Sequence, residues 1–141
     1  MAGNFEFAYN LNGGNFPPIV RKLPVAGGQT LATGDLVVLS SGKVAKAGTS
    51  VSGILGVMAE NANGLAEGTR VQVYLARPGH VWRATADADA TAHVLAGTTY
   101  DINADQTVDV GDAANGALSI IDLMEGSTTR VYVMFHDFAL P

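Results

Sequence analysis

The chain has 141 residues, no cysteine and a formal net charge of −5, with 13 acidic side chains against 8 lysines and arginines. Without cysteine there is no disulfide, thiolate nucleophile or cysteine-bound metal, so packing and backbone pairing must stabilise the fold. The cations are scattered, and only Arg21 and Lys22 are adjacent. Direct binding of DNA or RNA, which needs clustered cations, is therefore not expected.

A membrane partner and a secretory route are not expected either. No apolar run approaches the roughly 18 residues of a membrane-spanning helix. The N-terminal stretch MAGNFE lacks the basic start and the apolar segment of a signal peptide. We expect the protein to be made and used in a cytoplasm, or in an assembly formed there.

Residues 1–18 predict an extended N-terminal arm, separate from a single domain formed by residues 19–141. The arm carries four aromatic residues and ends in two prolines: Phe5, Phe7, Tyr9, Phe16, Pro17 and Pro18. The prolines enforce an extended backbone. Because the aromatics are numerous for a solvated tail, we expect the arm to dock on a neighbouring subunit. A frayed terminus is the alternative interpretation.

From residue 19 onward the sequence predicts short β-strands separated by turn signals such as Ser41-Gly42. Nine strands are expected, at residues 19–25, 35–40, 43–47, 53–60, 69–76, 80–84, 107–110, 118–124 and 130–137. Residues 35–47 predict a hairpin that turns at Ser41-Gly42. The only helical candidate is residues 87–96, one short turn or two at most, with Asp87 as the candidate N-cap and Gly97 after its end.

Two of these strands alternate between apolar and other residues. Their apolar positions are Val71, Val73 and Leu75 in one strand, and Val131, Val133 and Phe135 in the other. A period of two with one apolar face indicates half-buried antiparallel strands. Many short strands at close spacing predict an all-β fold, a small antiparallel β-barrel or β-sandwich with an extended N-terminal arm.

The sequence offers little for catalysis. The histidines His80, His93 and His136 form no HxH or HxxxH pair, and no serine lies in a GxSxG motif. We therefore expect no enzyme activity, no cofactor and no catalytic residue.

One stretch has the spacing of a calcium loop. Oxygen-bearing side chains occupy positions 101, 103, 105, 107, 109 and 112. However, Gln106 stands where a calcium loop needs glycine, and Asp112 stands where it has a bidentate glutamate. The preferred interpretation is a β-hairpin with residues 103–106 at its tip and no metal, with calcium binding as the alternative.

Three stretches share a pattern of glycine, aspartate and aliphatic residues at the spacing of turns and strands: residues 25–39, 42–47 and 53–58. The first contains GDLVVL and the second GKVAKA, and the chain ends with TTYDIN, NGALSIIDL and TTRVYVMFHD. Over roughly residues 19–138 the chain thereby resembles the capsid cement, or head decoration, proteins of tailed bacteriophages. Residues 1–18 lie outside this pattern.

The resemblance implies a structural protein of the virion. Members of that family are small β-proteins, often homotrimers, that bind the outer surface of the icosahedral head and clamp neighbouring subunits of the major capsid protein. For this chain it implies a homotrimer, the major capsid protein as partner, and no catalytic residue. The expected interface comprises the aromatics and prolines of the arm together with Trp82.

A different class of function stays open. A carbohydrate- or receptor-binding β-module stacks exposed aromatic side chains on sugar rings. Trp82 is the sole tryptophan of the chain, and Tyr74 and Tyr100 are the other candidates. Packing of Trp82 in the core or in a subunit interface is the competing interpretation.

Overall fold

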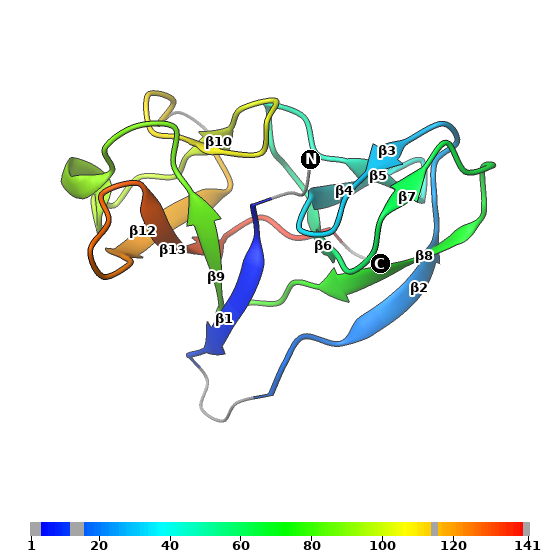
Figure 1. Ribbon diagram of the computed structural model, residues 1–141, viewed down its shortest axis with the longest axis horizontal. Helices are drawn as coiled ribbons and strands as arrows, with labels where there is room; N and C mark the ends of the chain where they lie inside the picture. Colours follow the sequence, from blue (N-terminus) through cyan, green and yellow to red (C-terminus); the bar gives the residue numbers. More distant parts are fainter. Residues whose placement is uncertain (1–3, 12–15, 114–115, 140–141) are drawn as a thin grey trace.

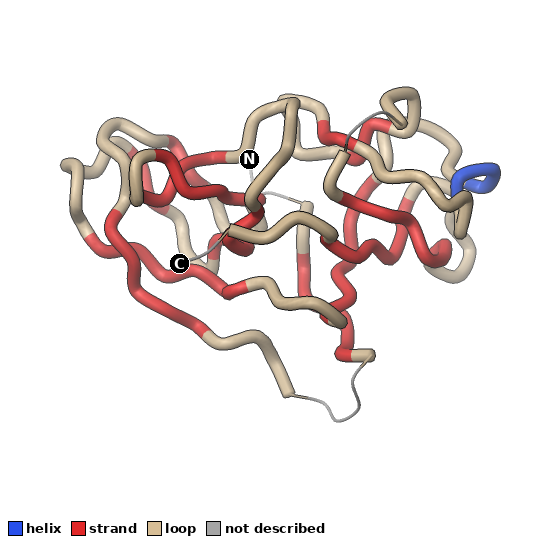
Figure 2. Tube along the Cα trace, turned by 180° about the vertical axis from the view of Figure 1, so that it is seen from behind, coloured by secondary structure: helices blue, strands red, loops and turns tan. Residues whose placement is uncertain are grey.

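The computed structural model describes residues 4–11, 16–113 and 116–139, and it is all-β (Figure 1). Within these ranges it contains thirteen strands and one short 3-10 helix. No helix in this part of the chain is long and apolar enough to span a bilayer. Figure 2 shows that long loops join many of the strands, so the loop conformations determine much of the shape of the molecule.

Two antiparallel sheets form the body, at the left and the right of Figure 1. The four-stranded sheet has the order β1 (Glu6–Asn10), β9 (His80–Thr85), β13 (Arg130–Phe135) and β12 (Leu118–Leu123). The five-stranded sheet has the order β2 (Val20–Pro24), β8 (Arg70–Leu75), β6 (Ile54–Met58), β4 (Leu36–Ser40) and β5 (Lys43–Lys46). No closed barrel ladder is found in the described chain, although a single parallel bridge between Val25 and Val44 links the end of β2 to β5.

Two small sheets complete the fold. One pairs β3 (Thr30–Leu31) with β7 (Ala62–Asn63), and the other pairs β10 (Asp101–Ile102) with β11 (Val108–Asp109). All nine strands predicted from the sequence are present, with ends shifted by a few residues. The strands that sequence analysis missed are β1, β3, β7 and β10. Three of these have two residues, too few to show a periodic pattern.

The predicted hairpin and the predicted facing of two strands are confirmed. Strand β4 pairs with β5, and the turn between them places Ser41 and Gly42 at positive φ, 50° and 76°. Two positive φ values define the turn that suits the twist of a two-residue hairpin. Side chains alternate between buried and half-buried along β8 and β13, so the apolar face of each strand points into the core.

The core has two parts that meet at strands β4 and β6. The larger part includes Ile54 and Val57 of β6 with the four-stranded sheet, and the smaller part includes Leu55 and Met58. Every residue of β6 is buried. At Gly56 an added Cβ would lie 1.9 Å from the carbonyl oxygen of Tyr74, so only glycine allows β6 and β8 to approach this closely.

The predicted helix is present only as a single turn. Residues Thr91–His93 form a single 3-10 turn, and Asp87 does not cap it. The Asp87 carboxylate instead accepts hydrogen bonds from Asn103 Nδ2 at 3.1 Å and from the Val110 backbone N–H at 3.2 Å. These bonds tie the loop to the β10–β11 hairpin, and this tertiary contact overrides the local helical preference of an alanine-rich stretch.

The predicted separate arm is also corrected. Residues 6–10 form β1, the edge strand of the four-stranded sheet, and β1 pairs with β9. The Phe5 backbone N–H donates to the Gly34 carbonyl at 3.0 Å, and the Phe5 side chain is only 3% exposed. This part of the N-terminal segment therefore belongs to the domain's own sheet and core.

Candidate interaction surface

The calcium-like stretch folds as the predicted hairpin. Its tip is closed by backbone hydrogen bonds between Asn103 and Thr107, and from Gln106 to Asn103. Gln106 takes the positive φ of 69° that glycine would have supplied. Its buried side chain accepts from the Leu36 N–H at 2.7 Å and donates to the Ala47 carbonyl at 3.4 Å. Gln106 thus anchors the hairpin to the body.

The side-chain oxygen atoms of this hairpin accept hydrogen bonds from within the protein. Asp101 is buried and accepts from the Val51 N–H at 2.9 Å. Asp105 accepts from the N–H and the hydroxyl of Thr107, and these bonds lower the pKa of Asp105 below its ordinary value. Among the described residues, no group of three or more histidine, aspartate or glutamate side chains is placed to hold a metal ion.

The three histidines have different surroundings. His93 Nδ1 lies 3.0 Å from the Tyr100 hydroxyl, and His136 Nε2 lies 2.6 Å from Ser119 Oγ. A serine beside a histidine is part of a hydrolytic site only when a third group orients the imidazole. The Asp137 carboxylate, which follows His136 in the sequence, instead accepts from the Gly53 backbone N–H at 3.0 Å.

His80 is buried among aromatic rings. Its imidazole makes edge-on contacts with Phe7 and Trp82, at centroid distances of 5.5 and 6.3 Å. Burial, and then the positive charge of Arg77, lower the pKa of His80 below its ordinary value. His80 Nδ1 has no hydrogen-bond partner in the described structure. These features are those of a neutral core histidine.

Several of the predicted interface residues lie in the core, which corrects the prediction. Trp82 has no exposed surface and stacks on Phe135 at a centroid distance of 5.6 Å. Phe5 contacts the same Phe135 ring edge-on, and Phe7 contacts Trp82. Phe5 and Trp82 therefore belong to the protein's own core, and Phe7 of β1 packs against that core half-buried.

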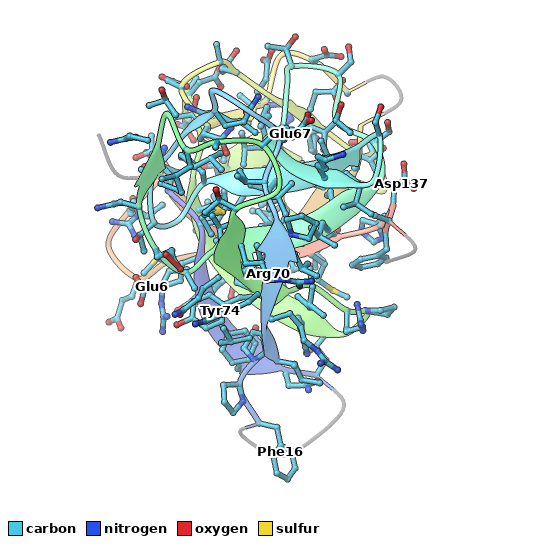
Figure 3. All side chains as sticks on the ribbon, turned by 90° about the vertical axis from the view of Figure 1, so that its right-hand side faces the viewer. Glu6, Phe16, Glu67, Arg70, Tyr74 and Asp137 are labelled. Carbon is cyan, nitrogen blue, oxygen red and sulfur yellow. The ribbon has the colours of Figure 1, made fainter. Side chains whose placement is uncertain are left out.

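The other predicted interface residues lie where the chain leaves β1 and enters β2. Tyr9 is partly exposed and its ring contacts Tyr132 edge-on. Pro17 is exposed and Pro18 is buried. Phe16 is 75% exposed, and Figure 3 shows its ring extending beyond the body of the protein. Of the predicted set, Phe16, Pro17 and Tyr9 remain available to a partner.

Exposed apolar side chains gather in this region. Of the six large hydrophobic residues that are exposed in the described chain, five lie between residues 9 and 20: Tyr9, Leu11, Phe16, Ile19 and Val20. We call these five residues the apolar end. The sequence did not identify Ile19 and Val20 as exposed surface residues, because both begin the strand predicted at residues 19–25. Scattered exposed hydrophobics are normal, but here five lie in one short segment, and Phe16 and Ile19 line the same hollow, which favours an interaction surface.

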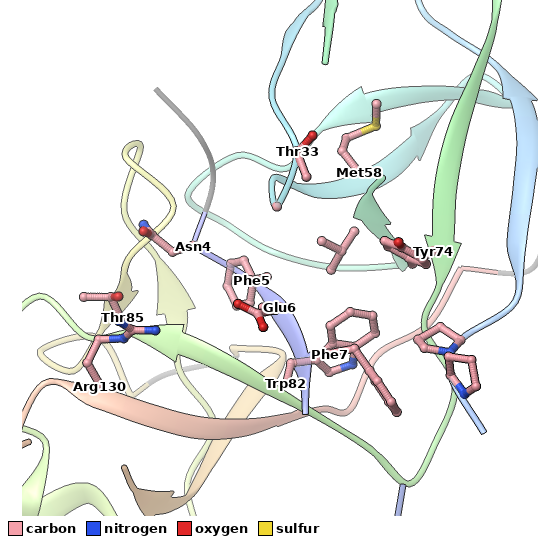
Figure 4. A pocket seen from close by; sticks show the side chains of 14 residues that line it. Asn4, Phe5, Glu6, Phe7, Thr33, Met58, Tyr74, Trp82, Thr85 and Arg130 are labelled. Atoms are coloured by element: carbon pink, nitrogen blue, oxygen red, sulfur yellow. The ribbon is translucent and has the colours of Figure 1, made fainter. Parts of the chain in front are cut away.

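A cleft of about 640 Å³ separates β1 from β6 and β8 (Figure 4). Its walls are mostly apolar, and they include Phe5, Phe7, Val57, Met58, Tyr74 and Trp82. Glu6 and Arg130 also line it. The cleft offers room for an apolar group, but its lining holds no nucleophile paired with a base.

Comparison of the chain with protein-family models, with curated proteins and with solved structures found no match. The candidate surface is therefore interpreted from its own geometry and chemistry.

Proposed function

We propose that this protein is a structural protein of a virus particle: a cement or decoration protein on the outer surface of a tailed-bacteriophage head. It binds neighbouring subunits of the major capsid protein and acts as a homotrimer. The observation that carries the proposal is the apolar end, where five large apolar side chains are exposed on an otherwise well-packed body. A surface of this kind serves binding to other protein.

The energetics suit an architectural role. A protein that binds the assembled shell, and not the separate subunits, shifts the equilibrium toward the intact head. Each contact can be modest because many copies act together on one particle. Such a function needs a rigid body and an adhesive surface, and it needs no reactive side chain.

The sequence stretches that resemble decoration proteins form the scaffold of the body. The stretch GDLVVL contains the first four residues of β4, GKVAKA contains β5, and residues 53–58 contain β6. These strands pair with one another and join the two parts of the core. The resemblance therefore supports a shared framework, whereas the contacts with a partner must come from the surface.

A carbohydrate-binding module is less well supported. Tyr100 is buried, and its hydroxyl is engaged by His93 and Thr98. Trp82 is buried as well. Of the three aromatic residues considered for sugar stacking, Tyr74 and Trp82 line the cleft, but Trp82 has no exposed surface, and one ring is a weak platform for a sugar.

The direct test uses heads assembled from the major capsid protein encoded by the same genome. The full chain is mixed with expanded and with unexpanded heads, and binding is measured by co-sedimentation. We expect saturable binding to expanded heads and a rise in the temperature at which they come apart. A folded protein that fails to bind both kinds of head would contradict the proposal.

A matched pair of variants locates the binding surface. Ile19→Ser with Val20→Ser makes the apolar end polar, and Lys43→Ser changes the opposite edge strand, β5. We expect the first variant to lose binding and the second to retain it. If both variants bind heads equally well, the apolar end is not the contact surface, although the protein still binds heads.

A further inference from the structure

A second hollow of about 350 Å³ lies between the small β3–β7 sheet and the tip of the β10–β11 hairpin. Strands β3 and β10 both lie toward the top of Figure 1. The volume falls within the range of small-molecule sites, about 300–1,000 Å³. None of the five residues of the apolar end is among the described residues that line this hollow. It is therefore separate from the surface that we assign to the capsid.

Polar side chains dominate the lining of this hollow. Of the described residues that line it, seven have polar side chains and two, Leu31 and Ala32, are apolar. The cleft beside β1, by contrast, has mostly apolar walls. We call the hollow the polar pocket, and the side chains that matter most in it are Asp35, Lys46, Asn61, Asp105 and Gln106.

Two carboxylates of the polar pocket are each anchored through one oxygen atom. Asp35 is only 2% exposed, and its Oδ2 accepts from the Ala32 backbone N–H at 2.9 Å. Asp105 Oδ1 accepts from the N–H of Thr107 at 3.2 Å and from its hydroxyl at 2.6 Å. These bonds leave Oδ1 of Asp35 and Oδ2 of Asp105 for hydrogen bonds to a ligand.

Two amide side chains are fixed in the same manner. Asn61 Oδ1 accepts from the Thr33 N–H at 2.9 Å, and Gln106 Oε1 accepts from the Leu36 N–H at 2.7 Å. A backbone N–H must face the oxygen of an amide, so these bonds define which end of each amide is its NH2 group. Gln106 Nε2 gives one hydrogen to the Ala47 carbonyl at 3.4 Å and keeps the other. Each amide therefore has an N–H left for a ligand.

The charges in the polar pocket favour a neutral ligand. Lys46 Nζ lies 3.8 Å from Asp35 Oδ2, so these two charges compensate each other. Asp105, which is exposed, adds a further negative charge. An anionic ligand would meet two carboxylates, and a cationic ligand would meet the Lys46 ammonium group. A ligand without charge avoids both repulsions.

We propose that the polar pocket binds a small neutral molecule with several hydroxyl groups, of the size of one sugar or cyclic polyol ring. A hydroxyl group both donates and accepts, so a ring that carries several of them matches a pocket of mixed donors and acceptors. The two carboxylates accept from the ligand, and the two amides and Lys46 Nζ donate to it. The two apolar lining residues contact the carbon–hydrogen face of the ring.

This site differs from the aromatic platform of a carbohydrate-binding module, because no aromatic side chain is among the described residues that line it. Binding depends on hydrogen bonds, whose net contribution is modest because each one replaces a bond to water. The polar groups are already held in place, so little side-chain freedom is lost on binding. For a single ring we expect a dissociation constant of about 1 mM.

The test is an NMR titration of the full chain with three neutral hexoses: glucose, galactose and mannose. The backbone N–H groups of Thr33, Leu36 and Thr107 report binding, because each is bonded to a side chain of the polar pocket. We expect at least one hexose to shift these signals in a saturable way. The matching uronic acid, which carries a carboxylate in place of a hydroxymethyl group, should bind at least about 10-fold more weakly.

Three variants locate the site. Lys46→Met removes a donor of the polar pocket, and Lys43→Met makes the same change on the same strand, β5, at a residue that does not line the pocket. Asn61→Ala removes an amide at an exposed position. We expect Lys46→Met and Asn61→Ala each to weaken binding at least about 10-fold, and Lys43→Met to leave it unchanged. The dispersion of the amide signals shows that each variant is folded.

A further arm of the titration distinguishes a free ring from a sugar unit within a glycan. A soluble polysaccharide built from the hexose that binds best is titrated in the same way. Binding of the polymer assigns the pocket to a sugar unit in a chain, and binding of the free hexose alone assigns it to a small free molecule.

Three results would overturn the inference. The first is the lack of a saturable shift with any of the three hexoses up to about 50 mM, well above the expected dissociation constant. The second is a uronic acid that binds as tightly as its hexose. The third is binding that Lys46→Met and Asn61→Ala leave unchanged, or that Lys43→Met weakens equally. No heads are present, so this test and the test of head binding can fail independently.

Discussion

His80 should make the stability of the protein depend on pH. The imidazole is buried against Phe7 and Trp82, and burial and Arg77 lower the pKa of His80 below 6.5. The unfolded chain therefore binds a proton at a higher pH than the folded protein does. The contribution of His80 to stability is complete above the unfolded pKa and is lost as the pH falls below it.

This dependence is measured by urea unfolding between pH 7.5 and pH 5, a window chosen around the ordinary histidine pKa of about 6.5. We expect the free energy of unfolding of the wild type to fall toward pH 5. His80→Leu should flatten this slope, and His136→Gln, a change at an exposed site, should not. An unchanged slope in His80→Leu would assign the dependence to other groups.

Phe135 and Tyr132 test the two faces of β13. Phe135 is buried between Trp82 and Phe5, so Phe135→Ala should destabilise the protein by about 3–5 kcal/mol. Tyr132 is half-buried and meets Tyr9 at the surface, so Tyr132→Ala should cost clearly less. Chemical denaturation of both variants gives the comparison. Equal losses would mean that both faces of β13 contribute equally to the core.

At the scale of elements, the contribution of β1 to stability shows whether the N-terminal segment is part of the fold or a loose arm. Because β1 pairs with β9 and Phe5 lies in the core, deleting residues 2–10 should destabilise the free protein by at least about 3 kcal/mol. Phe16→Ser, at an exposed site in the same segment, should change stability by no more than about 0.5 kcal/mol. Thermal unfolding of the deletion variant and of Phe16→Ser gives the comparison. If the deletion does not change stability, the segment is a loose arm and not part of the fold.

The β10–β11 hairpin should form without calcium. Asp101 and Gln106 bond to backbone groups of the body, and Asp105 bonds to Thr107 within the turn. These bonds already satisfy oxygens that a cation would have to recruit. A chelator should leave the melting temperature unchanged, because a ligand that does not bind the native state cannot stabilise it. A melting temperature that falls with chelator and recovers with added calcium would show a calcium site.

At the scale of the whole molecule, local patterns predicted most of the sheets. Alternation along β8 and β13, and the glycine of the β4–β5 turn, depend on residues next to each other in the chain, so they could be read directly. The helix at residues 87–96 is limited to one 3-10 turn, and Asp87 does not cap it because Asp87 bonds to Asn103 and Val110, which are distant in sequence. Propensity yields to such contacts.

The candidate surface was harder to predict for the same reason. Whether an aromatic side chain in the N-terminal segment reaches the core or the solvent depends on its pairing with β9, which no local pattern encodes. Phe5 and Phe16 look alike in the sequence, yet one is buried and the other projects.

The edges of the two main sheets have a consequence for proteins held at high density. Open edges can recruit further strands and start aggregation. Here each one is interrupted: β2 carries Arg21, Lys22 and Pro24, and β5 carries Lys43 and Lys46. The other two edges, β1 and β12, are irregular, with shifts of register beside Ala8 and Ile121. Crowded copies of this chain are thereby kept from fusing into fibrils, and contact between them is left to side chains.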